Sequence, residues 1–139
     1  LSMPTREVKM KILVGYEKSA VAEEALALAK KHAKAFNAKV YLLTSLTRSH
    51  ELQLEDIQKS ERELKNLRTQ FKAEGIDCET HAIVSAVSPG EDLVQFATDN
   101  EIDEIVIGVR RRSKVGKLLF GSNAQYIILQ AACPVVAVK

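Results

Sequence analysis

One basic segment of the chain combines the residue types that bind phosphate groups. It begins at Gly108, ends at the Gly121-Ser122 pair, and carries five cations within eight consecutive positions. These cations are Arg110, Arg111, Arg112, Lys114 and Lys117. Guanidinium groups can hold a phosphate through two parallel hydrogen bonds, and a helix starting at Gly121-Ser122 would offer its first N–H groups to the same anion. The segment therefore predicts a phosphate site, and a solvated basic loop with a helix cap is the alternative.

The spacing of the glycines separates this segment from two common nucleotide-binding motifs. The chain has no GxxxxGK[ST] sequence, which excludes a P-loop, and no GxGxxG sequence, which excludes the dinucleotide fingerprint. The prediction of a phosphate site is therefore stronger only if the basic segment follows a strand whose end borders a ligand site. This depends on the secondary structure around the segment.

Two alternating hydrophobic periods predict five strands and four helices. Short apolar runs predict strands at Lys11–Tyr16, Lys39–Leu46, Asp77–Val84, Glu104–Gly108 and Val135–Lys139. Apolar residues at helical spacing predict helices at residues 20–36, 57–71, 88–100 and 124–131. The polar stretch from Thr47 to Glu55 is predicted to be a loop.

The clearest local signal is the sequence Ser88-Pro89-Gly90-Glu91. Serine is a good helix cap, proline suits the first helical position, and Glu91 stands where a capping box needs a carboxylate. This motif predicts that the third helix starts directly after Ser88.

The alternation of strands and helices predicts where a ligand binds. Such alternation is typical of a parallel sheet with helices on both faces, and right-handed crossovers restrict it to doubly wound α/β topologies. Ligands of these folds bind beyond the carboxyl ends of the strands, where the strand order reverses. The loops that leave the first and fourth strands, Gly15–Ser19 and Gly108–Ser122, are therefore the predicted site.

The composition is that of an ordinary globular chain. Of the 139 residues, 46% are hydrophobic and 27% are charged, which excludes intrinsic disorder. No apolar run approaches the roughly 20 residues that cross a bilayer. We expect one domain over residues 3–139, with Leu1 and Ser2 as a tag remnant. A net charge of +2 gives no general attraction to nucleic acid.

Cysteines and histidines show no catalytic pattern. Cys78 and Cys133 form no CxxC pair, and their apolar neighbours favour buried thiols over a disulfide or redox pair. Low cysteine use and the lack of a signal-like N-terminus favour a cytoplasmic protein. His32 lies on an apolar helix face and is predicted to be packed or half-buried, while His50 and His81 complete neither an acyl-transfer triad nor a metal motif. We therefore name no catalytic residue and no metal ligand.

Three stretches carry a family resemblance: KILVGYEKS near the start, Ser88-Pro89-Gly90-Glu91, and IVIGVRRRSKVGKLLFGSNAQ followed by CPVVAVK. With them the chain resembles the universal stress protein family over essentially its whole length. ATP-binding members carry Gly-x2-Gly-x9-Gly-(Ser/Thr), and the nine-residue spacing is intact before Gly121. The resemblance implies the strand order 3-2-1-4-5 in a three-layer α/β/α fold. It also implies ATP, with Mg²⁺, at a site formed by Gly15, Glu17, Ser45, Gly108, Arg110, Arg111, Gly121, Ser122 and Asn123.

Two positions depart from the pattern of ATP-binding members. Glu17 stands where an aspartate usually faces the sugar, and Arg111 replaces the middle glycine of the motif. The Arg111 side chain either blocks the phosphate path, turns outward or contacts phosphate itself, and the sequence leaves these alternatives open. The backbone of Ser45 matches a position that faces the adenine in ATP-binding relatives.

The resemblance implies a regulatory stress-response protein rather than an enzyme. We can name no residue that orients water, so slow ATP hydrolysis is the upper limit. The resemblance also implies a homodimer joined by antiparallel pairing of the last strand, through Val135, Val136, Ala137 and Val138. The main alternative is an interaction module of the same fold that does not use nucleotide because Arg111 impairs the site. Nucleic-acid binding through Arg110–Lys117 is least favoured, because no aromatic side chains interleave with these cations.

Overall fold

The computed structural model describes residues 9–17, 20–49, 51–109 and 121–139. Strands and helices alternate, as the sequence predicts. The strands are β1 (Lys11–Gly15), β2 (Lys39–Thr47), β3 (Cys78–Ser85), β4 (Glu104–Gly108) and β5 (Val135–Val138). The helices are α1 (Ala20–Phe36), α2 (Leu54–Ala73), α3 (Pro89–Asp99) and α4 (Ser122–Gln130). In this part of the chain, no helix is both long enough and apolar enough to span a membrane.

The five strands form one parallel sheet in the order β3-β2-β1-β4-β5, which confirms the predicted topology. The central strand β1 pairs with β2 through Leu13 and Tyr41, and with β4 through Leu13 and Ile105. The strand order reverses at β1, because β2 and β3 lie on one side of it and the chain then crosses to add β4 and β5 on the other side. The carboxyl ends of β1 and β4 thus border the edge where folds of this class bind ligands.

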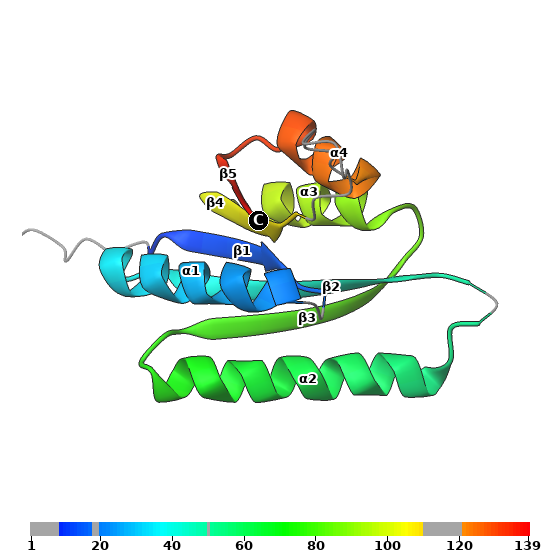
Figure 1. Cartoon of the computed structure of the whole chain (residues 1–139), viewed down its shortest axis with the longest axis horizontal. Helices are drawn as coiled ribbons and strands as arrows, with labels where there is room; N and C mark the ends of the chain where they lie inside the picture. Colours follow the sequence, from blue (N-terminus) through cyan, green and yellow to red (C-terminus); the bar gives the residue numbers. More distant parts are fainter. Residues whose placement is uncertain (1–8, 18–19, 50, 110–120) are drawn as a thin grey trace, which may run out of the picture.

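The sheet separates two hydrophobic cores, because successive strand residues point to opposite faces. In β1, Ile12 and Val14 belong to a core with α1 and α2, which contributes the fully buried Phe71. Leu13, between them, belongs to the opposite core with Leu93 of α3 and with α4. Figure 1 shows α2 alongside β3, and α3 and α4 together near β4 and β5. Each face of the sheet is therefore covered by one pair of helices.

The loop between β2 and α2 is shorter than predicted. The sequence predicts a loop from Thr47 to Glu55, whereas Thr47 ends β2 and Glu55 lies in α2. β2 continues because it pairs with β3 as far as Ser85. The start of α2 is stabilised by the Asp56 carboxylate, which accepts a hydrogen bond from the Gln53 N–H at 2.9 Å.

An ion-pair cluster links α1 to the end of α2. The Glu74 carboxylate lies 2.7 Å from Lys30 Nζ and 2.8 Å from Lys34 Nζ. Hydrogen bonds from Lys30 and Lys34 lower the pKa of Glu74 from 4.5 to about 2. Lys30 Nζ also lies 5.0 Å above the centre of the Phe71 ring. The cluster thus joins the two helices above the core that they share.

We expect acid to weaken this link between the helices. The pKa of Glu74 is about 2 in the folded chain, whereas its ordinary value is 4.5. The ionised carboxylate therefore stabilises the fold fully at pH values above 4.5, and this stabilisation is lost as the pH falls toward the folded-state pKa of about 2. Between about pH 5 and pH 2, the melting temperature measured by circular dichroism should therefore fall less in Glu74→Gln than in the unaltered chain. Glu24→Gln, an exposed change on α1, is the control. Equal pH profiles for the two variants would contradict the assignment.

Candidate functional site

The chain leaving β1 is held against β2 at the carboxyl edge of the sheet. Gly15 pairs with β2 on one side and with β4 on the other. The Tyr16 N–H donates to the Leu43 carbonyl at 2.8 Å, and the Tyr16 carbonyl accepts a hydrogen bond from Thr44 Oγ1 at 3.0 Å. Glu17 follows and is exposed. These bonds fix the chain next to Glu17 at the carboxyl end of β1, where the strand order reverses.

Helices approach both Gly15 and Gly108 closely. A β-carbon on Gly15 would lie 2.6 Å from Leu93 Cδ1 of α3, and one on Gly108 would lie 2.7 Å from Val21 Cγ1 of α1. Sequence reasoning explains Gly108 by the approach of a ligand to the backbone. The structure adds a packing reason, because the first turn of α1 lies against the end of β4.

α4 begins at this edge with an N-terminus that is open among the described residues. Gly121 is the N-cap residue, and no side chain in the described ranges caps the first turn. The first backbone hydrogen bond of the helix joins the Gln125 N–H to the Gly121 carbonyl at 3.0 Å. The N–H groups of Ser122, Asn123 and Ala124 precede it and have no partner within the helix. Together with the exposed Ser122 hydroxyl, they are the kind of donors that bind an anion.

α3 also begins at this edge, but its N-terminus is closed. Ser88 Oγ accepts a hydrogen bond from the Glu91 N–H at 3.2 Å, which confirms the predicted cap. The Glu91 carboxylate accepts from the Ser88 hydroxyl at 2.8 Å, rather than from the Ser88 N–H as in a full capping box. The Gly90 N–H donates to Asn123 Oδ1 of α4 at 3.0 Å. Of the two helices, α4 therefore offers the better site for an anion.

The side chain of Ser45 is hydrogen-bonded to a residue of α3. Ser45 Oγ donates to Asp92 Oδ2 at 2.8 Å in a partly buried contact. Sequence reasoning missed Asp92 as a site residue, because an acidic residue in the first turn of a helix is already explained by the helix dipole. It also used Gly90 only as part of a helix cap. The structure shows that both residues connect α3 to predicted site residues.

The structure brings seven of the nine predicted site residues to the carboxyl edge of the sheet. They are Gly15, Glu17, Ser45, Gly108, Gly121, Ser122 and Asn123. Arg110 and Arg111 lie outside the described residues, as do the other three cations of the basic segment. The contacts of all nine with a ligand stay predictions.

The described histidines are paired with carboxylates away from this edge. His32 Nδ1 lies 2.8 Å from Glu104 Oε2, and the histidine side chain is 26% exposed, in agreement with the predicted packed or half-buried position. His81 Nε2 lies 2.9 Å from Glu79 Oε2. His50 lies outside the described residues. Within the described ranges, no group of three or more His, Cys, Asp or Glu residues could hold a metal ion.

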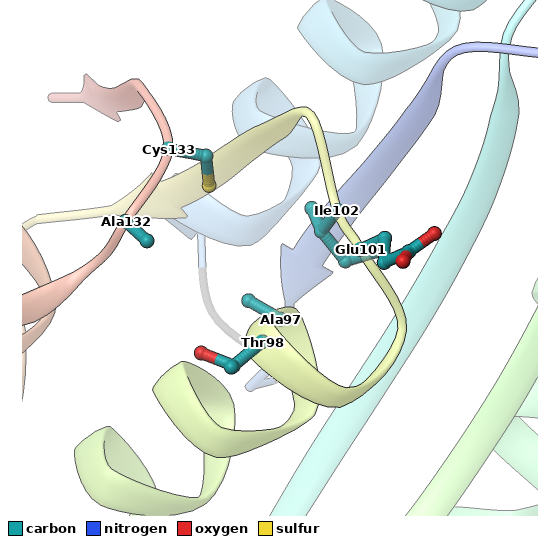
Figure 2. Close-up of a pocket in the computed structure, with 6 residues that line it drawn as sticks. All are labelled: Ala97, Thr98, Glu101, Ile102, Ala132 and Cys133. Carbon is teal, nitrogen blue, oxygen red and sulfur yellow. The ribbon is translucent and has the colours of Figure 1, made fainter.

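A small cavity of about 170 Å³ lies at the opposite, amino edge of the sheet. It is lined by Ala97, Thr98, Glu101, Ile102, Ala132 and Cys133. Figure 2 shows these residues on the end of α3, the turn before β4 and the segment before β5, with the Cys133 thiol pointing toward the others. The cavity is thus formed by different residues from the candidate site.

The two cysteines are free thiols in different surroundings. Cys78 is 4% exposed, and burial raises its pKa from 9.0 to about 12. Cys133 is only half-buried, and burial raises its pKa as well. The predicted burial is therefore confirmed for Cys78 and only partly met by Cys133.

We expect Cys133 to react with N-ethylmaleimide before Cys78 does, because reaction requires an accessible thiolate. Mass spectrometry of labelled peptides should find Cys133 modified slowly in the folded chain, and Cys78 modified only after unfolding in urea. In Cys133→Ser, the folded chain should take up no label. Equal labelling rates for the two thiols in the folded chain would contradict this order.

β5 is an apolar edge strand. Among the described strands it pairs only with β4. Its residues, Val135–Val138, are half-buried except for Ala137, which is exposed. On the neighbouring helix α4, Leu129 is 76% exposed. An unpaired edge of this kind can accept a strand from another chain.

Comparisons with known proteins agree on one family. The sequence model of the universal stress protein family matches residues 10–139. A universal stress protein of Thermus aquaticus, named for its place in the 3′ region of a QAH/OAS sulfhydrylase, is 30% identical over 92% of this chain and 97% of that relative. The structure is similar to a universal stress protein of Archaeoglobus fulgidus, with a TM-score of 0.82, 36% identity, and coverage of 95% of this chain and 100% of that one. A second Archaeoglobus fulgidus structure, in complex with dAMP, has a TM-score of 0.79 and 32% identity over 96% of this chain and 100% of that one.

Proposed function

Because the chain belongs to the universal stress protein family, we propose that it binds an adenine nucleotide, ATP with Mg²⁺, and acts as a regulatory dimer in a cytoplasmic stress response. The observation that carries this proposal is the open N-terminus of α4, which contacts the first turn of α3 at the carboxyl edge of the sheet. A relative that is 32% identical was solved in complex with dAMP, which supports an adenine nucleotide. The free thiols of Cys78 and Cys133 are compatible with a reducing compartment.

The donor set at the start of α4 fits the phosphate groups of a nucleotide. The first N–H groups of the helix and the Ser122 hydroxyl are donors, and the Asn123 amide adds its Nδ2 because its Oδ1 already accepts from Gly90. Gly121 brings the backbone close, and Arg110 and Arg111 supply positive charge. Mg²⁺, carried by the phosphates, would offset the remaining negative charge.

The nucleoside would lie along the ends of β1 and β2. In this arrangement the Glu17 carboxylate accepts hydrogen bonds from the ribose hydroxyls, and the backbone of Ser45 faces the base. Gly15 and Gly108 keep the strand ends free of side chains. Tyr16, hydrogen-bonded to Leu43 and Thr44 of β2, fixes the backbone that leads to Glu17.

Calorimetric titration of nucleotide-stripped protein with ATP and Mg²⁺ tests this proposal. We expect saturable heat and a rise in melting temperature. Mass spectrometry of ligand released from freshly purified protein should identify an adenine nucleotide. No heat and no thermal shift at millimolar ATP would reject nucleotide binding.

Arg111 motivates a second candidate function, because it stands where the ATP-binding motif has glycine. In that case the chain is an interaction module of the same fold that works without nucleotide. Arg111→Gly should then create ATP binding in a chain that otherwise has none. A variant that still fails to bind ATP would remove Arg111 as the reason.

The proposed dimer pairs two β5 strands in antiparallel fashion along their free edges. The strand Val135–Val138 is apolar and pairs with β4 on its other side. Sedimentation equilibrium should therefore give twice the mass of one chain. Ala137→Pro should favour the monomer, because proline removes a donor and is poorly accommodated between paired strands.

A further inference from the structure

The first turn of α3, Pro89–Asp92, touches both sides of the candidate site. On one side, the Asp92 carboxylate accepts a hydrogen bond of 2.8 Å from Ser45 Oγ, near the end of β2. On the other side, the Gly90 N–H donates a hydrogen bond of 3.0 Å to Asn123 Oδ1, in the first turn of α4. One short backbone segment thus connects the side assigned to the base with the side assigned to the phosphates.

The contact between α3 and α4 is tight at Gly90. A β-carbon on Gly90 would lie 3.1 Å from both the carbonyl oxygen and Oδ1 of Asn123, and 3.2 Å from its Cα. Two of these three atoms belong to the backbone, so a rotation of the Asn123 side chain would not relieve the crowding. The position of the first turn of α4 therefore depends on the absence of a side chain at Gly90.

The first turn of α3 is itself held in a fixed shape. The Asp92 N–H donates to the Ser88 carbonyl at 3.0 Å, and Ser88 and Glu91 exchange the two hydrogen bonds of the cap. Leu93, which follows, is 5% exposed and anchors the helix on the sheet. The turn therefore presents the Asp92 carboxylate to Ser45 and the Gly90 N–H to Asn123 from one fixed backbone segment.

We propose that the first turn of α3 is a positioning element, which holds the base side of the nucleotide site through Asp92 and the phosphate side through Gly90. Asp92 acts through Ser45, and Gly90 acts through Asn123. The inference rests on the proposed function, because it assigns these residues a role around that site. It requires neither Asp92 nor Gly90 to touch the nucleotide.

Probes that carry only one part of ATP separate the two sides. In Asp92→Ala, the Kd values for adenosine and for ATP should rise by about 3- to 10-fold, the effect of one hydrogen bond, while the Kd for inorganic tripolyphosphate stays unchanged. Ser45→Ala should show the same pattern. Asp99→Ala is the matched control, because Asp99 lies at the far end of α3, where its carboxylate accepts a hydrogen bond from Gln95 Nε2 at 2.8 Å. It should change none of the three affinities.

Gly90→Ala should show the opposite pattern. The added methyl group displaces the first turn of α4, so the Kd values for tripolyphosphate and ATP should rise while the Kd for adenosine does not. Circular dichroism establishes whether this variant folds. The Asp92→Ala and Ser45→Ala titrations decide the proposal if it does not.

Two kinds of result would overturn the inference. Asp92→Ala could weaken all three ligands equally, which would indicate a general loosening of the fold, or it could weaken none of them. If unaltered protein binds ATP and either result is obtained, the inference fails and the proposed function stands. If unaltered protein binds no ATP, the proposed function fails and the inference falls with it.

Discussion

Replacing Phe71 by alanine should lower the free energy of unfolding by about 3–5 kcal/mol, as for other large buried aromatics. Phe71 is 0% exposed and belongs to the core formed by α1, α2 and the sheet. The Lys30 ammonium lies 5.0 Å above its ring, so the change also removes a cation–π contact. Since small domains are stable by only about 5–15 kcal/mol, this loss would be a large share of the total.

The matched control is Phe36→Ala, which removes the same atoms at an exposed site. Phe36 ends α1, is 57% exposed, and meets the His32 ring at a centroid distance of 5.8 Å. Its truncation should cost less than about 1 kcal/mol, as for surface changes in general. Urea unfolding followed by circular dichroism gives both values. If the two variants lost equal stability, α2 would not be anchored through Phe71.

The fold was predictable because local rules govern most of its elements. Ile12, Leu13 and Val14 form a continuous apolar run, which is typical of a strand buried on both faces, and all three are at most 1% exposed. The Ser88 cap likewise follows from neighbouring residue types alone. The end of β2 was not predictable in this way. Thr47 is polar and belongs to the strand only because β3 extends far enough to pair with it.

The candidate site was predictable only in part, because its parts come from distant segments. A glycine at the end of a strand and a Gly-Ser helix start are visible in the sequence at Gly108 and Gly121. The hydrogen bond between Ser45 and Asp92 joins residues that are 47 positions apart, and it depends on how α3 lies across the sheet. The contact between Gly108 and Val21 depends in the same way on the placement of α1. Pattern rules describe single elements, so contacts between elements fall outside them.

Ser122→Asp should abolish most ATP binding without destabilising the fold. Ser122 is the first residue of α4 and is exposed, where a carboxylate interacts favourably with the helix dipole by about 0.3–1 kcal/mol. The same carboxylate would lie against the proposed phosphate position, and like charges in contact cost several kcal/mol. The Kd for ATP should therefore rise by at least about 30-fold, which corresponds to about 2 kcal/mol.

The two effects of Ser122→Asp have opposite signs, so an unfolded variant cannot mimic the expected result. The melting temperature should stay level or rise, the affinity for adenosine should not change, and only ligands with phosphate groups should lose affinity. Gln130→Glu introduces the same charge at the far end of α4 and should leave ATP binding intact. Calorimetric titrations of both variants provide the comparison. If Ser122→Asp bound ATP as tightly as the unaltered chain, the phosphates would not lie at the start of α4, and the open N-terminus would need another explanation.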